Sequence, residues 1–121
     1  MGETLGPEMF ANCRGADLPM RLNIKWAPKI MACLADGPRR FSELQRPLQG
    51  ISPKVLAESL RSMERDGTIS RTSYPGMPPK VVYDLTDLGR SLQRVVESWC
   101  AWADEHLDDV REARRTYEQR A

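Results

Sequence analysis

The side chains best suited to chemistry in this 121-residue chain are the cations and hydroxyls between residues 38 and 80. This segment holds eight Lys or Arg against four acids, a balance of +4, although the whole chain carries only +1. Arginine binds phosphates and guanine edges, while lysine and serine more often hold phosphate. Because local rather than total charge attracts a polyanion, the segment is a candidate nucleic-acid surface. Ordinary solvated helix faces could also account for much of this charge.

The best-defined part of this segment is GISPKVLAESLRSMERDG, residues 50–67, which predicts one short helix. Ser52 can cap its first turn, and Pro53 suits a position where a missing N–H costs nothing. Gly67 follows the last turn and can adopt the left-handed conformation that ends a helix. The apolar positions recur with helical spacing and form one narrow stripe: Leu56, Leu60 and Met63.

The opposite face of this helix is polar and partly basic. A helix with one anchored stripe and a small basic outer face can enter the major groove of DNA. Lys54 and Glu58, four residues apart, could instead form an ordinary surface pair. The candidate DNA-reading residues on this helix are Ser52, Lys54, Ala57, Glu58 and Arg61.

A second short helix is predicted just before it, in RRFSELQRPL, residues 39–48. Two short helices joined by a tight glycine-containing connection match the helix-turn-helix pattern. Arg39, Arg40 and Ser42 at the start of this helix are candidate phosphate contacts. Ser42 and Gln45 could instead form a capping box.

The hydrophobic period changes after Gly67 and predicts a β-hairpin. Residues 68–74 and 81–85 alternate as strands do, and PGMPPK between them predicts a stiff loop. A hairpin directly after a DNA-reading helix is the wing of a winged helix, so the predicted fold is mainly α with a small β-hairpin. Arg71 and Lys80 could reach phosphate or the minor groove. A plain surface hairpin is an equally acceptable interpretation of this segment alone.

A long C-terminal helix is predicted over residues 87–118, capped at Thr86, with a solvated and fraying end over 111–120. Its apolar positions alternate at spacings of three and four and exceed what a small winged helix buries alone. We therefore expect dimerisation through this helix, although residues 13–36 could instead cover it within one chain. The candidate dimer-interface residues are Leu92, Val95, Val96, Trp99, Trp102, Ala103 and His106.

The N-terminal part gives weaker patterns: an irregular, flexible segment over 1–12, a possible short helix over 13–22, and a firmer helix over 24–36. Pro28 is compatible with that last helix only within its first turn. No apolar run approaches membrane-spanning length, and no signal-peptide pattern opens the chain. We therefore expect a cytoplasmic protein with reduced thiols. Cys33 falls on an apolar stripe and is expected in the core, and Cys100 in the core or the dimer seam.

Taken together, these motifs resemble the HxlR family of bacterial winged-helix regulators. The resemblance runs from Cys13 to about Leu107 and rests on KW at 25–26, GPRRFSEL at 37–44, the 50–67 motif, and YPGMPPKVVYDLTDLGRSL at 74–92. It implies one winged helix-turn-helix domain over 1–121, with the DNA-binding part at 39–86. It further implies a homodimeric transcription regulator, often a repressor, with the 52–66 helix in the major groove. The N-terminal segment and the long last helix would build the dimer.

Cys13 lies thirteen residues before Trp26, the offset of the family's N-terminal cysteine. In some members that cysteine senses oxidants or electrophiles, which makes Cys13 a candidate redox sensor. This chain has Arg14 where the family commonly has proline, and Arg14 is the one adjacent cation that could lower the pKa of the thiol. A small-molecule pocket at the dimer seam is a competing account of regulation.

Two-fold pairing of the recognition helices predicts binding to an inverted repeat in double-stranded DNA. The alternative is a winged helix that contacts a protein partner and does not bind DNA. The acids Glu58 and Glu64 and the near-neutral total charge are compatible with this alternative. Catalysis has little support, because the sequence has one His and none of the CxxC, HExxH, phosphate-loop or nucleophile-elbow motifs. We expect no enzyme activity, no cofactor and no metal, and the acidic residues between 104 and 112 are expected to form a solvated face.

Overall fold

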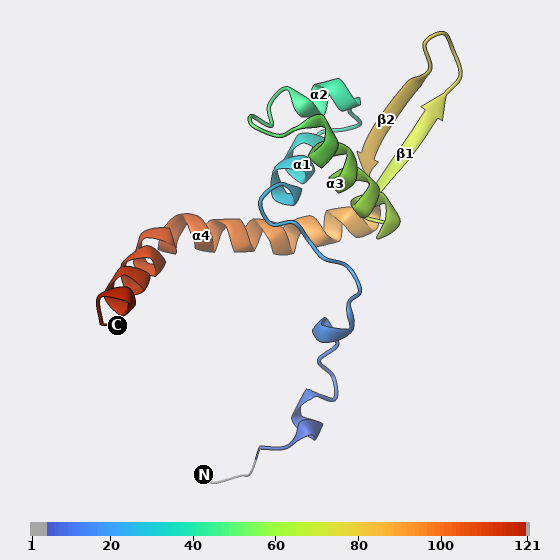
Figure 1. The fold of residues 1–121 in the computed structure, drawn as a ribbon. Coiled ribbons are helices and arrows are strands. Elements are labelled where there is room, and N and C mark those ends of the chain that lie inside the picture. Colours follow the sequence, from blue (N-terminus) through green and yellow to red (C-terminus); the bar gives the residue numbers. More distant parts are fainter. Residues whose placement is uncertain (1–4, 121) are drawn as a thin grey trace.

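The computed structural model describes residues 5–120 and is mainly helical with one small hairpin (Figure 1). This is the architecture that the sequence predicted, with a long C-terminal helix. Two short 3-10 turns at Pro7–Phe10 and Gly15–Asp17 come first. They are followed by α1 (Ala27–Leu34), α2 (Phe41–Gln45), α3 (Pro53–Arg65), β1 (Ile69–Tyr74), β2 (Lys80–Leu85) and α4 (Asp87–Arg120).

The core lies between α1, α3, the base of the hairpin and the first half of α4. Helix α1 begins where Pro28 falls in the first turn, as its missing N–H requires, and presents a stripe of buried residues. The apolar stripe predicted on α3 is buried as expected. The buried hydrophobic residues are Trp26, Ala27, Ile30, Met31, Leu34, Leu44, Leu48, Ile51, Leu56, Leu60, Met63, Ile69, Leu85 and Val96.

Helix α3 has the two ends that its sequence predicted. The Ser52 hydroxyl accepts a hydrogen bond from the Val55 N–H at 3.1 Å. Gly67 adopts a φ of +80° and donates its N–H to the Glu64 carbonyl at 3.0 Å, which closes the last turn. Strand β1 starts two residues later, so the direction of the hairpin follows from where α3 stops.

The hairpin pairs β1 and β2 antiparallel, from Ile69 opposite Leu85 to Tyr74 opposite Lys80. Arg39 adds an isolated bridge to Tyr83, with reciprocal backbone hydrogen bonds of 2.9 and 2.8 Å. This bridge fixes the connection between α1 and α2 against the base of the hairpin. The free end of the hairpin projects away from the helices (Figure 1). The Met77–Pro78 peptide bond in its loop is cis.

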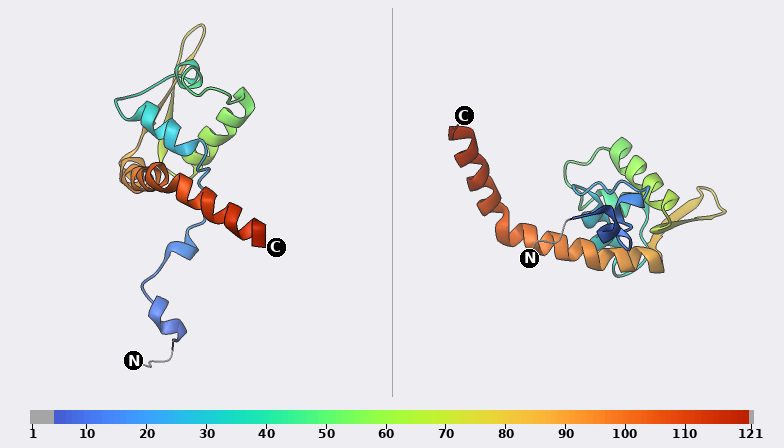
Figure 2. Two further views of the ribbon diagram at one scale, coloured as in Figure 1. Left: turned by 90° about the vertical axis from the view of Figure 1, so that its left-hand side faces the viewer. Right: turned by 90° about the horizontal axis from the view of Figure 1, so that it is seen from below.

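Helix α4 is capped by Thr86, as predicted: the Gly89 N–H donates to the Thr86 hydroxyl at 3.0 Å. The same hydroxyl donates to the Gly67 carbonyl at 2.6 Å and so ties α4 to the end of α3. The helix runs below α1, α2, α3 and the hairpin in the view of Figure 1 and continues well past them (Figure 2). No helix within residues 5–120 is long and apolar enough to cross a membrane.

Several expected boundaries were wrong. Instead of a helix over 13–22 there is only the Gly15–Asp17 turn, where no residue is buried and Pro19 follows closely. The expected helices over 24–36 and 39–48 are shorter, with Pro28 and Pro47 near their limits. By contrast, the helix expected over 87–118 agrees with α4 to within two residues, and its end is exposed as expected, while the fraying of 111–120 stays a prediction. Of the expected flexible segment 1–12, residues 1–4 lie outside the described part.

Candidate nucleic-acid interface

The outer face of α3 is open to solvent. Because Leu56, Leu60 and Met63 face the core, the helix turns its other side to solvent. The residues predicted to read DNA are exposed there, except for the half-buried Ala57: Ser52, Lys54, Glu58 and Arg61.

A cleft of about 420 Å³ separates this face from the hairpin. It is lined by Ala57, Arg61 and Glu64 of α3, by Arg71 of β1 and by Tyr83 of β2. The structure thus brings together three residues, Ala57, Arg61 and Arg71, that the sequence assigned separately to a helix and a wing. Two cations from different elements on one open cleft form a suitable cradle for a phosphate chain.

Sequence reasoning missed Tyr83 and Glu64 as cleft residues. The alternation of Tyr83 with Val81 and Leu85 predicted only that these three residues share one face of their strand. The strand register places Tyr83 opposite Arg71. A correct prediction of this register would therefore have indicated that Tyr83 lies close to Arg71. Glu64 was recognised as an exposed acid but not as a cleft residue, because its distance from β1 depends on how α3 packs.

The three residues predicted as phosphate contacts before α3 have different surroundings. The Nε of Arg39 donates to the Cys33 carbonyl at 3.3 Å, and the side chain is partly buried. Arg39 therefore links the end of α1 to the hairpin, and its position does not match that of a freely exposed phosphate contact. Arg40 and Ser42 are exposed at the start of α2 and remain accessible to DNA.

The start of α2 is closed by an acid rather than by the suggested pair of Ser42 and Gln45. The Glu43 carboxylate accepts the Arg40 backbone N–H at 2.8 Å. An acidic side chain in the first turn of a helix also interacts favourably with the helix dipole. Ser42 is thus left free of the capping role that sequence reasoning had kept open.

The hairpin is exposed at every residue from 71 to 80. Its two predicted cations lie at different heights, because Arg71 is in the middle of β1 and Lys80 opens β2. The Lys80 ammonium lies 5.9 Å from the centroid of the Tyr74 ring, and the two residues are paired in the register. This cation–π contact positions Lys80 where the loop begins.

The cations of this surface are not held in ion pairs within the described residues, although Glu64 shares the cleft with Arg61 and Arg71. Among residues 5–120, the ion pairs are Arg90 with Asp84, His106 with Glu105 and Asp109, and Arg115 with Glu112. None of these pairs involves Lys54, Arg61, Arg71 or Lys80. An external anion can therefore bind these side chains without first breaking an ion pair in the described part.

Comparison with known proteins decides the family. The model of the HxlR-like helix-turn-helix family matches residues 21–111. The chain belongs to this family. It is 36% identical to the HTH-type transcriptional regulator YtfH of Escherichia coli over 103 residues, which is 84% of this chain and 82% of YtfH. The resemblance found in the sequence is thereby confirmed, and this HxlR-like protein is a transcriptional regulator of the helix-turn-helix type.

Solved structures agree with this assignment. The transcriptional regulator YtfH from Salmonella typhimurium superposes with a TM-score of 0.65 at 41% identity, covering 75% of this chain and 81% of that one. The redox regulator HypR in its reduced form gives a TM-score of 0.65 at 33% identity, covering 72% of this chain and 86% of that one. The winged helix-turn-helix architecture is thus shared with these two regulators.

Helix α4 of the HxlR-like protein has a large apolar face that its own chain leaves uncovered. Val95, Trp99 and Trp102 are 65%, 55% and 55% exposed, whereas Leu92, Ala103 and His106 are half-buried. The His106 ring lies 4.9 Å from the Trp102 ring, and its Nδ1 is 3.2 Å from Asp109. Residues 13–36 therefore do not cover this face.

Val96 differs from the other predicted interface residues. It is only 4% exposed and belongs to the core of its own chain. A neighbouring protomer could gain almost nothing from contact with it. Adjacent side chains on a helix point in directions about 100° apart, so Val95 faces solvent whereas Val96 faces the core of its own chain.

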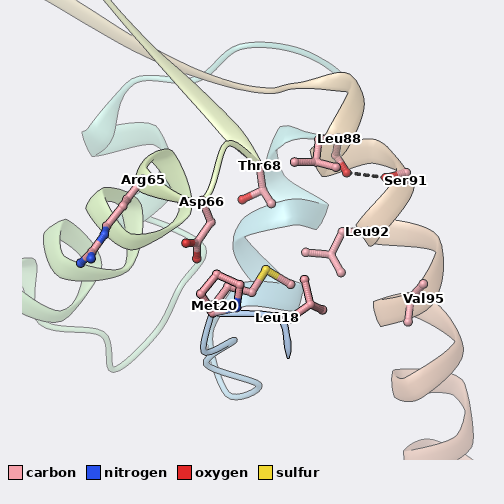
Figure 3. Close-up of a pocket in the computed structure, with 10 residues that line it drawn as sticks. Leu18, Met20, Arg65, Asp66, Thr68, Leu88, Ser91, Leu92 and Val95 are labelled. Atoms are coloured by element: carbon pink, nitrogen blue, oxygen red, sulfur yellow. Dashed lines mark hydrogen bonds between the residues drawn. The ribbon is translucent and has the colours of Figure 1, made fainter. Parts of the chain in front are cut away.

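An apolar cavity of about 500 Å³ adjoins the start of this face, between the N-terminal segment, the end of α3 and α4 (Figure 3). Leu18 and Met20 approach it from one side, and Leu88, Leu92 and Val95 from the other. Arg65, Asp66, Thr68 and Ser91 supply polar groups around it. The cavity therefore lies between the C-terminal end of α3 and the first turns of α4.

The three thiols have different environments. Cys13 is exposed between the two N-terminal turns, whereas Cys33 and Cys100 are half-buried and pack against the core. Burial raises the pKa of the Cys33 thiol, and the nearby Arg39 opposes this only in part. Cys13 is thus the most accessible thiol of the described residues, and Cys33 is an inner residue, as predicted.

Proposed function

We propose that this HxlR-like regulator is a cytoplasmic homodimer that binds an inverted repeat in double-stranded DNA and represses transcription, without enzyme activity or a cofactor. The observation that carries the proposal is the cleft in which Arg61 of α3 and Arg71 of β1 face the same open space. With α3 in the major groove, one DNA strand would follow this cleft. Arg61 would then read a base edge, and Arg71 would hold the adjacent phosphate.

Around these two arginines, the remaining contacts have distinct roles. Lys54, Arg40 and Ser42 are exposed near the helix starts and would hold phosphates. Glu58 could accept a hydrogen bond from cytosine, and Ala57 leaves room for a base methyl group. Ser52 would serve mainly as the helix cap that fixes the angle of α3, because its oxygen already accepts a backbone N–H.

The dimer would form through α4, together with the N-terminal segment. Tryptophans that are more than half exposed are costly in a monomer and are favoured at interface centres. Pairing two copies through Val95, Trp99 and Trp102 would place the two α3 helices about 34 Å apart on one face of DNA. Changing Trp99 and Trp102 to Glu should convert the dimer to a monomer in light scattering.

Charge reversal tests the DNA contact directly. The variant Lys54→Glu/Arg61→Glu should lose retention of its own genomic DNA in a shift assay while keeping dimer mass. Arg111→Glu/Arg115→Glu makes the same change in charge on the exposed end of α4 and should bind as the wild type does. If the wild type and both variants all fail to retain genomic DNA, the protein-contact alternative is favoured, and Glu58 and Glu64 on the outer face then become candidate contacts for a protein partner. Equal retention by the two variants would instead show that α3 is not the DNA contact.

Regulation through Cys13 is the second part of the proposal. The name of HypR describes a redox regulator, and Cys13 is exposed in this chain. Oxidation or alkylation of Cys13 would reorient the dimer and change its affinity for DNA. A Cys13→Ser variant should then lose the response to diamide in a DNA-shift assay. A full response to diamide in that variant would refute the role of Cys13, because another thiol would then have to carry the response. A small effector in the apolar cavity between α3 and α4 is the competing account of regulation.

A further inference from the structure

The tip of the hairpin differs chemically from its base. Met77 is 100% exposed, and no residue between Arg71 and Lys80 is charged. We propose that Met77 enters the minor groove beside the major-groove site and makes the wing selective for deformable A·T steps. The inference rests on the proposed DNA binding and assigns its wing a specificity residue.

The geometry allows the tip to reach a groove floor. Arg71 lines the cleft beside α3, and Tyr74 at the end of β1 is three positions further along the strand. At about 3.3 Å per residue, the strand extends about 10 Å beyond Arg71 before the loop begins. A minor groove is only about 7.5 Å deep, so a hairpin anchored on phosphate by Arg71 is long enough to place its tip at the base edges.

The loop is also restrained before it binds. Pro75, Pro78 and Pro79 fix three φ angles around Met77, and Lys80 lies over the Tyr74 ring where the strands meet the loop. A Cβ on Gly76 would lie 3.3 Å from the Pro78 carbonyl oxygen, so the turn itself is closely packed. A restrained loop loses less conformational entropy when it binds, which favours insertion of an otherwise solvated side chain.

A methionine at this position favours a different minor-groove sequence from the one that an arginine would favour. Its unbranched thioether side chain has no donor and gains from contact with apolar base surface. In G·C pairs the guanine 2-amino group occupies the floor of the minor groove, and A·T pairs leave it open. A cation prefers the narrow, strongly negative groove of A-tracts, whereas an uncharged wedge prefers flexible TA steps. Met77 should therefore favour TA steps over A-tracts.

The test uses a duplex that the wild-type protein selects from random-sequence DNA. Each base pair flanking the half-sites is changed in turn to G·C and then to inosine·C, which has the major groove of G·C but lacks the 2-amino group. For wild-type protein, G·C at the wing position should weaken binding about tenfold, and inosine·C should restore it. An A-tract there should bind less well than a TA step.

Substitutions at the tip complete the test, and their melting temperatures should match the wild type because the side chain is solvated. Met77→Leu should keep the discrimination. Met77→Ser should lose it with an unchanged salt dependence, and Met77→Arg should shift the preference towards A-tracts and steepen the salt slope by about 1. Equal discrimination by Met77→Ser and wild type would overturn the inference while leaving DNA binding intact. Failure of the wild type to select any duplex would overturn the proposed function and this inference together.

Discussion

A single added methyl group at Gly89 should disturb the junction on which both α4 and the hairpin depend. Gly89 is buried in the first turn of α4, against the start of β1. A Cβ there would overlap the Thr68 carbonyl oxygen and lie 2.9 Å from its carbon. That carbonyl accepts the Thr86 N–H at 3.1 Å, and its neighbour Gly67 accepts the Thr86 hydroxyl. The overlap is with backbone, so no side-chain rotation relieves it.

The expected magnitude follows from three opposing effects. Overpacking at a well-packed site costs about 1–3 kcal/mol, and loss of one hydrogen bond at the α4 cap costs a further ~1 kcal/mol. Replacing glycine by alanine inside a helix returns about 1 kcal/mol. Gly89→Ala should therefore lower the free energy of unfolding by about 1–3 kcal/mol, or the melting temperature by roughly 3–6 °C per kcal/mol.

Calorimetry at equal protein concentration is the appropriate assay, because dimerisation makes the melting temperature depend on concentration. Gly15→Ala is the matched control, since an added Cβ there meets nothing within 4 Å, and it should change stability by less than about 0.5 kcal/mol. A Gly89→Ala protein as stable as wild type, or more stable, would show that helix propensity outweighs the overlap. The close contact between Gly89 of α4 and the Thr68 carbonyl would then be refuted.

Two further predictions concern the recognition helix and the inner thiol. Ser52→Ala removes the acceptor of the Val55 N–H and should lower the free energy of unfolding by about 1 kcal/mol. Urea titration measures this change, and an unchanged unfolding midpoint would exclude the cap. Burial raises the pKa of Cys33 above 9.0, so iodoacetamide should modify it more slowly than Cys13 in the folded protein, as mass spectrometry of peptides would show. Because burial disfavours the charged thiolate, the folded protein loses stability as the pH rises from the ordinary pKa of cysteine towards the raised pKa of Cys33, and equal modification rates would contradict the assignment.

What the sequence determined by itself was local. The ends of α3 at Ser52 and Gly67, its buried stripe, and the hairpin after it were all predicted, because caps, helical period and strand alternation depend on residues within a turn of one another. Proline positions also fixed where α1 can begin. The same local patterns, in the order seen here, were sufficient to recognise the family.

Only the tertiary structure decided which of these residues share a site. The cleft joins Arg61 to Arg71 and Tyr83 because α3 packs against the base of the hairpin, a contact that no local pattern encodes. Arg39, expected among the exposed cations, is drawn inward by the Cys33 carbonyl and the strand pairing with Tyr83. Side chains of the same type differ in exposure because different neighbours cover them. The packing between distant segments determines which neighbours those are.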